Sequence, residues 1–469
     1  MRRLLSILLL LAALPCGATT YYLANASTSP VGNDSNSGTD SAHPWLTPNH
    51  AVNCGDVILA AASSSYVYTN FHQGSWGTVT CAAGNDVAWL KCATFDTCKI
   101  ITSGTVADMA VDKSYWGIQG WEVQAPSTSD YAPCFNFGPN ATALLPVHNV
   151  VFANNVVNGC GPSGIAVSAS SGTATADYAV IVGNIVYNAT QSNTSCYNGI
   201  NIFEPANTDT LPGTHIYIAG NFSYGNFDPN PCAGGVVSDG EGVILDTLNH
   251  FSYTGQIAVE NNIFVANGGR GWQVNLSTAP VYFVNNTSWG NSTDTAMNSA
   301  PCEDSAIQSA SNADAHLNLT VTNAATSCAS TLALYAYGVV TGNATDHVYQ
   351  NWAYSASGHN FTTSGSGFTN GPNNTTADPV LASPSAPGAP SCGSASSVPN
   401  CMATVISNFT PTVAAAKAYG YQIPSSTAVY DPLFPQWLCT VTNLPAGLIE
   451  NGCLQASATT GSLSGGTLK

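Results

Sequence analysis

A short unit that recurs along the middle of the chain constrains the fold more than any other feature of the sequence. Each copy has two or three apolar or small residues, then asparagine, and usually another apolar residue, at 151–156, 181–185, 218–222, 259–263 and 283–287. Internal similarity at such spacings is typical of solenoids, in which each repeat buries its apolar face by stacking on its neighbours. The repeat therefore predicts a stack of similar coils.

The asparagine of each unit predicts a bend at the same point of every coil. Asn155, Asn184, Asn221, Asn262 and Asn286 are separated by 29, 37, 41 and 24 residues, which indicates that some coils carry longer loops. Stacked asparagines can hydrogen-bond to their counterparts in neighbouring coils, and these bonds satisfy amides that would otherwise be buried without partners. We expect these five asparagines to be structural.

A second repeat places glycine before a short strand, at 164–167, 199–202, 242–245 and 271–274. Alternate residues after each glycine are apolar, as in a strand that turns one face toward the inside of a coil. Long helical periodicity is absent from this region. The two repeats together predict two strands per coil, joined by the asparagine bend.

This pattern resembles the pectate-lyase-like right-handed β-helix superfamily. Residues 21–23, 32–39, 44–45 and 55–56 resemble the beginning of many secreted members, and 239–246, 260–262 and 267–271 resemble a block common in bacterial β-helix proteins often described as probable lyases. The resemblance covers roughly residues 21–290. It implies an all-β fold, a right-handed parallel β-helix with an irregular C-terminal segment, in a protein that acts on polysaccharide.

The composition divides the chain into four parts. Arg2 and Arg3 precede a mostly apolar run at 4–14 and small residues at 16–18, which predicts a signal peptide over residues 1–18. Because that run is too short to span a bilayer, we expect a secreted protein without a membrane anchor. We expect the β-helix domain with its N-terminal cap at 19–380, a loop-rich cap segment at 381–453 and a disordered tail at 454–469.

The cysteines support an oxidising compartment. Of 15 cysteines, Cys16 lies in the predicted signal peptide, and the other 14 are scattered without the close pairs of a zinc ribbon. Disulfides are the natural interpretation in a secreted protein. Cys92 with Cys98 and Cys392 with Cys401 are candidates for closing local loops, although the sequence does not fix the connectivity.

The charge balance disfavours nucleic acid as a partner. The chain has 8 Lys+Arg against 25 Asp+Glu, a formal net charge of -17 that becomes -19 when Arg2 and Arg3 leave with the signal peptide. Binding to phosphates requires a basic surface, which this composition lacks. We expect a monomer whose partner is a polysaccharide.

Aligning the predicted coils on their glycines brings charged residues together. The residues directly before the four glycines are Ser163, Asn198, Glu241 and Arg270. Because adjacent coils stack at about 4.8 Å, Glu241 and Arg270 should be neighbours, with Asp239 on the same side of the coil. A second column, four residues after each glycine, contains Ser168, Phe203, Asp246 and Asn275, with Glu204 next to it.

The resemblance implies a polysaccharide lyase that uses these columns. β-Elimination must neutralise a uronate and remove a proton from carbon 5 of the sugar. Calcium bound by Asp239, Glu241 and Asp246 would supply the first function, since calcium prefers several oxygen ligands. By analogy with β-helix lyases, Arg270 would remove the proton with Glu241 as the second catalytic residue, while Glu204, Asn275 and Asn201 would bind substrate.

Three alternatives remain open at this stage. Glu241 and Arg270 can form a structural salt bridge between neighbouring coils, because structural ion pairs also concentrate charge. Asp239 and Glu241 can act as the carboxylate pair of a glycoside hydrolase. The long polar surface can also bind glycans without any reaction. A pectin hydrolase of the polygalacturonase type is disfavoured. Of the several sequence motifs of those β-helix hydrolases, only Asn207-Thr208-Asp209 is present.

Overall fold

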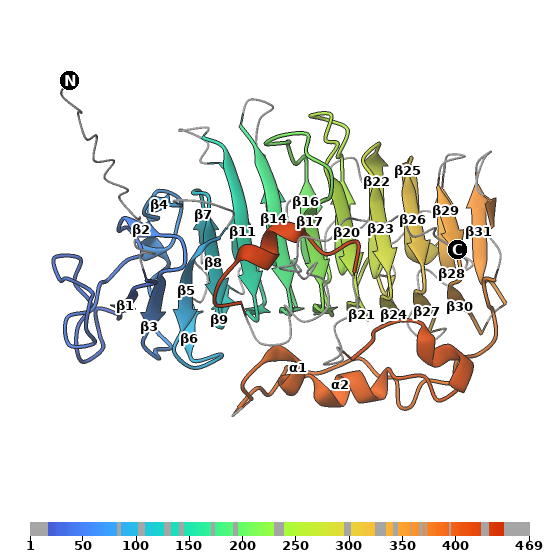
Figure 1. Cartoon of the computed structure of the whole chain (residues 1–469). Helices are drawn as coiled ribbons and strands as arrows, with labels where there is room; N and C mark the ends of the chain where they lie inside the picture. Colours follow the sequence, from blue (N-terminus) through green and yellow to red (C-terminus); the bar gives the residue numbers. More distant parts are fainter. Residues whose placement is uncertain are drawn as a thin grey trace, which may run out of the picture.

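The computed structural model describes residues 17–444, with gaps at 82–85, 102–107, 126–132, 140–144, 170–173, 191–195, 229–238, 295–301, 324–333, 341–345, 357, 365–368, 371–372, 394 and 424–430. Most of the predicted signal peptide and the whole predicted tail lie outside the described residues. Figure 1 shows a row of stacked coils that forms an elongated body, with the C-terminal segment lying along it.

Three long sheets run the length of this body, and their neighbouring strands are parallel. Sheet 1 has twelve strands: β1 Thr20–Leu23, β3 Val57–Ala60, β5 Ala88–Cys92, β8 Trp116–Gln119, β11 Val147–Ala153, β14 Ala176–Val182, β17 Thr214–Ala219, β20 Gln256–Glu260, β23 Val281–Val284, β26 Ala313–His316, β29 His347–Tyr349 and β32 Thr369–Asn370.

Sheets 2 and 3 have nine strands each. Sheet 2 contains β6 Cys98–Ile101, β9 Trp121–Gln124, β12 Val156–Asn158, β15 Ile185–Tyr187, β18 Phe222–Tyr224, β21 Ile263–Val265, β24 Thr287–Trp289, β27 Leu319–Val321 and β30 Trp352–Tyr354. Sheet 3 contains β7 Met109–Val111, β10 Phe135–Phe137, β13 Ile165–Ser168, β16 Ile200–Phe203, β19 Val243–Asp246, β22 Trp272–Ser277, β25 Cys302–Ala310, β28 Leu334–Val340 and β31 Phe361–Ser364.

The three ladders confirm the predicted all-β parallel β-helix, but the prediction of two strands per coil is wrong. Each full coil passes from sheet 1 through the asparagine bend to sheet 2, and then through the glycine bend to sheet 3. Most strands of sheet 2 have only three residues. A strand that short shows too little alternation to be separated from the bend before it.

The predicted asparagine ladder is confirmed and is longer than the sequence indicated. Asn184 Oδ1 accepts hydrogen bonds from the backbone N–H and from Nδ2 of Asn155, at 2.9 and 3.1 Å. The same paired bonds continue through the other predicted asparagines and on to Asn318, Asn351 and Asn374. The ladder thus satisfies a row of buried amides along eight coils.

The residue before each ladder asparagine explains the glycines and asparagines found there. Asn154 and Gly183 have φ of 52° and 62°, and Gly220 and Asn261 have φ of 64° and 56°. This left-handed conformation favours glycine and asparagine over other residues. The conformation of the bend therefore accounts for the glycine or asparagine that precedes these four ladder asparagines.

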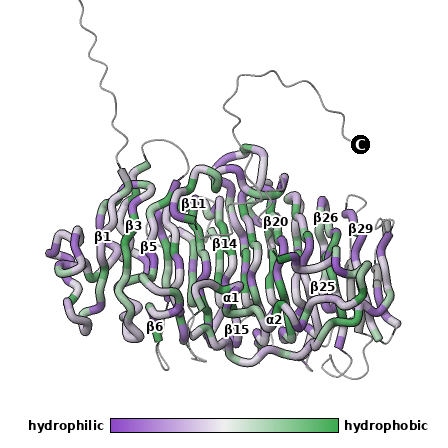
Figure 2. The backbone as a smooth tube through the Cα atoms, turned by 60° about the horizontal axis from the view of Figure 1, so that its bottom comes forward, coloured by the Kyte–Doolittle hydropathy of each residue, from purple (hydrophilic) through white to green (hydrophobic). Residues whose placement is uncertain are grey.

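Inward-facing side chains fill the coils. In sheet 3, Ile165, Ile200, Val243 and Trp272 follow one another in register and are completely buried. The Trp272 ring stacks on Phe283 with 4.1 Å between centroids, so Trp272 is a core residue. Figure 2 shows hydrophobic and hydrophilic residues alternating along the coils, as expected when only one face of each strand is buried.

The C-terminal segment covers parts of two sheets and includes the short helices α1 Val398–Cys401 and α2 Ala403–Asn408 (Figure 1). Its first part packs on the outer face of sheet 2, where Met402 and Phe409 join a cluster with Phe222 and Trp289. Its second part includes a 3-10 helix at Gln436–Thr440 and packs on sheet 1. Further 3-10 turns lie at Tyr68–Asn70 and Ala414–Ala418, and β2 Val52–Asn53 pairs with β4 Val79–Thr80.

Disulfides join both of the predicted local pairs, Cys92–Cys98 and Cys392–Cys401. Two further bonds, Cys54–Cys81 and Cys134–Cys160, connect residues 27 and 26 positions apart. Such bonds are typical of proteins that fold in an oxidising compartment. Among the described residues, none of the helices has the length and apolar character that a membrane span requires.

Candidate functional site

The residues predicted to carry chemistry gather on the outer side of sheet 3, at strands β16, β19 and β22. Phe203, Asp246 and Asn275 are aligned in register across these three strands. The residues between them in the strands, such as Ile202 and Leu245, face the core and are buried. Asn201 lies in the other outward row. It is in register with Ile244 of β19, which is in register with Gln273 of β22.

The predicted column before the glycines is also present. The backbone N–H of Gly199 donates to Glu241 O, and that of Gly242 donates to Arg270 O, both at 2.8 Å. These bonds place Asn198, Glu241 and Arg270 on successive coils. The alignment of coils on their glycines therefore gives the correct neighbours in space.

Asp246 is a half-buried carboxylate with two side-chain donors. Its Oδ1 accepts from Asn275 Nδ2 at 2.9 Å and from the Thr247 hydroxyl at 3.0 Å. Burial raises the pKa of Asp246, whereas these hydrogen bonds oppose the rise by favouring the ionised form. The sequence predicted both Asp246 and Asn275 as site residues, and the structure brings them into direct contact.

Asp239 lies at the edge of the same surface and is protonated more readily than an ordinary aspartate. Burial raises the pKa of Asp239 to about 7, and the negative charges of Asp246 and Asp228 add to the effect. A hydrogen bond with Asn198 and the charge of Arg270 oppose this rise. Asp239 and Asp246 are therefore neighbouring carboxyl groups, and they differ in how strongly hydrogen bonds favour the ionised form.

Glu241 is held inside the protein. The residue is 1% exposed, and burial together with Asp239 raises the pKa of its carboxyl well above the usual range. Its Oε1 lies 3.7 Å from Arg270 Nη1, while its Oε2 is buried and has no hydrogen-bond partner among the residues that the structure describes. Glu241 is therefore less accessible to solvent than Asp239 and Asp246.

Arg270 is engaged on every side by protein groups. Its Nη2 and Nε contact Glu303 Oε2 at 2.7 and 3.1 Å, and Nη1 donates to Gln273 Oε1 at 2.8 Å. Burial lowers the pKa of Arg270, but the charges of Glu303 and Glu241 outweigh it and raise the pKa above its usual value. This arrangement favours the salt-bridge alternative that the sequence left open.

Glu303, which the sequence reasoning missed, is the main partner of Arg270. It occupies the next place in the column, one coil beyond Arg270, because Trp272 pairs with Ser305 in the sheet. The next coil has Asp304 at the position of Gly271, so an alignment of the coils on their glycines does not reach Glu303. Asp304 instead accepts hydrogen bonds from the Asn291 backbone N–H and side chain.

Glu204 forms one edge of the surface. It follows β16 in the left-handed conformation, with φ of 48°, and its Oε1 lies 2.5 Å from His250 Nδ1. His250 belongs to the loop after the next strand of the sheet, so no partner of Glu204 was evident from the sequence. Phe203 beside it leaves 37% of its surface exposed, so an aromatic ring borders the carboxylates.

Asn201, the third residue predicted to bind substrate, is half-buried on this face. Its Oδ1 is buried and has no hydrogen-bond partner in the described residues. A buried amide oxygen without a donor is unusual in a folded protein. The position is compatible with a contact to a bound molecule.

The three predicted calcium ligands do not fit a calcium ion as they are arranged. Among the described residues, no group of three or more carboxylate, histidine or cysteine side chains converges well enough to hold a metal. Glu241 Oε1 faces Arg270, and Asp246 Oδ1 already has two donors. Calcium prefers six or more free oxygen ligands, and these three residues do not offer such a set.

The Asn207-Thr208-Asp209 motif has a structural explanation. Asn207 Oδ1 accepts from the backbone N–H groups of Thr254 and Gly255, and Thr208 N donates to the buried carboxylate of Asp177. Asp209 accepts from the Tyr178 hydroxyl at 2.8 Å. These residues hold their loop against neighbouring coils.

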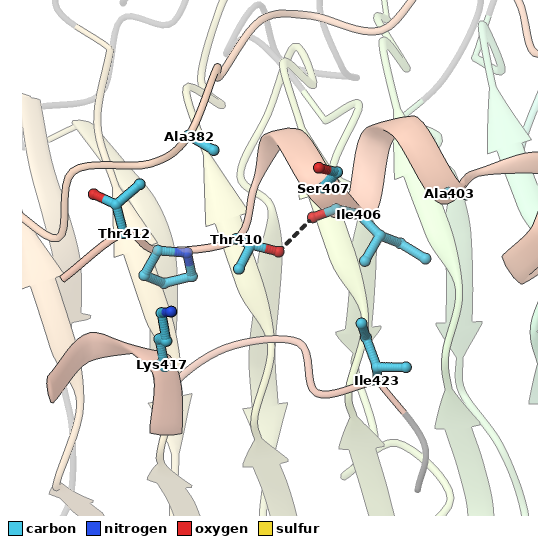
Figure 3. A pocket seen from close by; sticks show the side chains of 9 residues that line it. Ala382, Ala403, Ile406, Ser407, Thr410, Thr412, Lys417 and Ile423 are labelled. Carbon is cyan, nitrogen blue, oxygen red and sulfur yellow. Dashed lines mark hydrogen bonds between the residues drawn. The ribbon is translucent and has the colours of Figure 1, made fainter. Parts of the chain in front are cut away.

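A shallow hollow on the C-terminal segment is a separate feature (Figure 3). It is lined by Ala382, Ala403, Ile406, Ser407, Thr410, Pro411, Thr412, Lys417 and Ile423. On its wall, the Thr410 hydroxyl donates to the Ile406 carbonyl at 2.8 Å, at the C-terminal end of α2. No carboxylate lines this hollow, and none of the predicted site residues contributes to it.

Comparison with known proteins gives likenesses in fold. No family profile matches the sequence, and no curated protein matches it significantly. Among solved structures, pectate lyase Pel9A matches over 78% of this chain and 83% of its own, at 14% identity and a TM-score of 0.42. The chain is a parallel β-helix protein. Its three ladders of parallel strands confirm the predicted fold.

Two epimerase modules show the same kind of likeness. The A-modules of the Azotobacter vinelandii mannuronan C-5 epimerases AlgE4 and AlgE6 each match over 69% of this chain and 91% of their own. The identities are 11% and 13%, and the TM-scores are 0.26 and 0.30. The choice of reaction has to come from the side chains of this chain.

Proposed function

We propose that this protein is a secreted, glycan-active enzyme that hydrolyses an uncharged polysaccharide at the outer face of sheet 3. Asp239 would be the general acid and Asp246 the general base or nucleophile. The observation that carries the proposal is that the chain brings Asp239 and Asp246 to one face of sheet 3, where Asn275 and Thr247 hydrogen-bond to Asp246 and burial raises the pKa of Asp239.

Glycoside hydrolysis requires one protonated and one ionised carboxyl group on either side of the bond that is cleaved. Asp239, with its pKa raised to about 7, retains a proton at weakly acidic pH. Asp246 receives hydrogen bonds from Thr247 and Asn275, which stabilise its negative charge. Two carboxyl groups whose environments differ in this way are suited to acid and base roles.

The charge of this face supports an uncharged substrate. Asp239, Asp246 and Glu204 lie on or beside it, while the nearby guanidinium of Arg270 is already paired with Glu303 and Glu241. An anionic polymer would be repelled by these carboxylates and by the net charge of the chain. The ring of Phe203 and the amides of Asn201 and Asn275 can contact neutral sugars.

A lyase with Arg270 as the base, which the family resemblance implies, has weaker support. A base must reach the proton that it removes and must have a lowered pKa. Arg270 is 8% exposed, and the neighbouring carboxylates raise its pKa. Hydrolysis by Asp239 and Glu241, the other carboxylate pair considered from sequence, is disfavoured by the burial of Glu241.

The proposal is tested by measuring reducing-end release from a panel of neutral and anionic polysaccharides, while ultraviolet absorbance monitors unsaturated products. We expect release from a neutral polymer without unsaturated product. Asp239→Asn and Asp246→Asn should each lower turnover by about 10²-fold or more, the usual contribution of a general acid or base. Asp40→Asn is the matched control, because that carboxylate is 55% exposed on an N-terminal loop.

Three outcomes would contradict the proposal. An unsaturated product would establish a lyase, and glycan binding without any product would indicate a non-catalytic binding protein. Full activity in both aspartate variants would place the reaction elsewhere.

Activity should also fall on the alkaline side with an apparent pKa near that of Asp239, about 7, as the general acid loses its proton.

A further inference from the structure

A second group of aromatic and ionisable side chains lies on the outer face of sheet 1, at strands β23, β26 and β29. Tyr282, Asp314 and His347 are in register across these strands, and His316 and Tyr349 pair in the next outward row. His347 is exposed, and the other four are half-buried. This cluster, which we call the sheet 1 platform, is on a different sheet from the carboxylates of the proposed active site.

A central carboxylate holds the rings of the platform. His316 Nδ1 lies 2.7 Å from Asp314 Oδ1, and burial together with the charge of Asp314 raises the pKa of Tyr349. The rings of His316 and Tyr349 are stacked, with centroids 5.0 Å apart and planes inclined by 14°. Asp314 and His316 are 20% and 22% exposed in their side chains, so the cluster is ordered by its own contacts while remaining accessible.

The rest of sheet 1 shows why this cluster is notable. In earlier coils, the same outward rows contain apolar residues such as Val151, Val180 and Ala258, which pack against Phe434 and Trp437 of the C-terminal segment. Figure 1 shows that segment crossing in front of β11 to β20. Beyond these strands the first row continues as Tyr282, Asp314 and His347, and the second continues from Val284 to His316 and Tyr349. The change of side chains follows the end of the described cover.

We propose that the sheet 1 platform binds neutral sugar units of a polysaccharide, as an accessory site separate from the active site. Aromatic rings present flat apolar surface on which the C–H face of a pyranose can stack, and they lose little conformational entropy when they bind. The Asp314 carboxylate and the imidazoles of His316 and His347 can hydrogen-bond to sugar hydroxyl groups.

The arrangement of the platform favours an extended glycan. Its residues come from three successive coils, which repeat at about 4.8 Å along the solenoid. A chain that runs along the solenoid therefore meets a polar or aromatic group at each coil. The negative net charge of the protein disfavours an anionic polymer here, as it does at sheet 3.

The test is affinity electrophoresis and calorimetry with neutral glucan, xylan, mannan and galactan. Asp246→Asn is used as the background so that hydrolysis does not consume the ligand. Tyr349→Ala should weaken binding by between roughly twofold and tenfold, the size of one aromatic contact. Tyr349→Phe keeps the ring and should retain most of the binding.

Tyr22→Ala is the matched control. Tyr22 is half-buried on the same outer face of sheet 1 and in the same row as Tyr349, at the opposite end of the solenoid. Its removal should leave binding unchanged. Thermal melts of each variant establish that the protein is folded.

The proposal is overturned if the protein binds none of the four polymers, or if Tyr349→Ala and Tyr282→Ala both bind as well as the background protein. It is also overturned if Tyr349→Phe loses as much affinity as Tyr349→Ala in folded protein. Because the readout is binding, a failure of the proposed hydrolysis leaves this test intact, and the two proposals fail separately.

Discussion

Arg270 carries a buried charge whose stability depends on particular partners. Glu303 and Glu241 compensate it electrostatically, and Gln273 accepts one of its hydrogen bonds. Removing one member of a buried ion pair leaves an uncompensated charge, which is far more costly than the pair itself is stabilising. The contact of Arg270 with Glu303 is shorter than its contact with Glu241, so Glu303 should contribute more to compensating the charge.

We therefore expect Arg270→Met to lower the free energy of unfolding by about 3–5 kcal/mol. Denaturant unfolding followed by circular dichroism measures this loss. The double variant Arg270→Met/Glu303→Gln should recover part of it, because the charge of the nearer partner, Glu303, is then no longer left uncompensated. If Arg270→Met is fully stable and only inactive, the structural interpretation fails and the catalytic one regains support.

The asparagine ladder is the element that repeats along the solenoid. Asn221 both donates to Asn262 and accepts from Asn184, so its side chain serves two neighbouring coils. Its substitution removes the acceptor of the Asn184 backbone N–H and one of the two acceptors of Asn184 Nδ2, which also donates to Phe152 O. Buried polar groups that lose their partner cost about 1–3 kcal/mol each.

Asn221→Ala should accordingly destabilise the protein by a few kcal/mol, on the order of that penalty for each group left unpaired. The matched control is Asn400→Ala on the exposed side of helix α1, which should change stability by less than about 0.5 kcal/mol. Equal unfolding midpoints for the two variants would show that the ladder contributes little to stability.

The whole molecule contains several carboxyl groups that are easier to protonate in the fold than in the unfolded chain. Burial raises the pKa of Glu260 to about 8, with Asp431 of the C-terminal segment adding to the effect, and burial raises the pKa of Asp304 to about 6. Asp239, at about 7, belongs to the same set. The folded state thus binds more protons than the unfolded state between about pH 4 and 8.

Because protons bound preferentially by the folded state stabilise it, stability should fall as pH rises through this range. Thermal melts at pH 5 and pH 8.5 measure the effect, with the higher melting temperature expected at pH 5. Glu260→Gln should reduce the difference, since the amide keeps a hydrogen-bond donor but does not titrate. A melting temperature that rises with pH would contradict the assignment of these raised pKa values.

The sequence by itself determined the repeating parts of this protein. The asparagine bend needs a left-handed residue before it and the glycine bend has no room for a Cβ, so both leave a motif in the sequence. Their repetition predicted the parallel β-helix and the stacked asparagines. The short spacing of Cys92 with Cys98 and of Cys392 with Cys401 also allowed the local disulfides to be anticipated. The outward columns with Asp239, Glu241, Asp246 and Arg270 followed from the same periodicity.

Only the tertiary structure decided which of these groups are buried and what they contact. Loops of different length separate the coils, so Glu303 becomes the partner of Arg270 although no shared motif connects them. Strands of three residues are stabilised by the strands above and below, and this left sheet 2 undetected in the sequence. Burial and long-range pairing depend on the stacked coils, and these determine which carboxyl groups can reach a substrate.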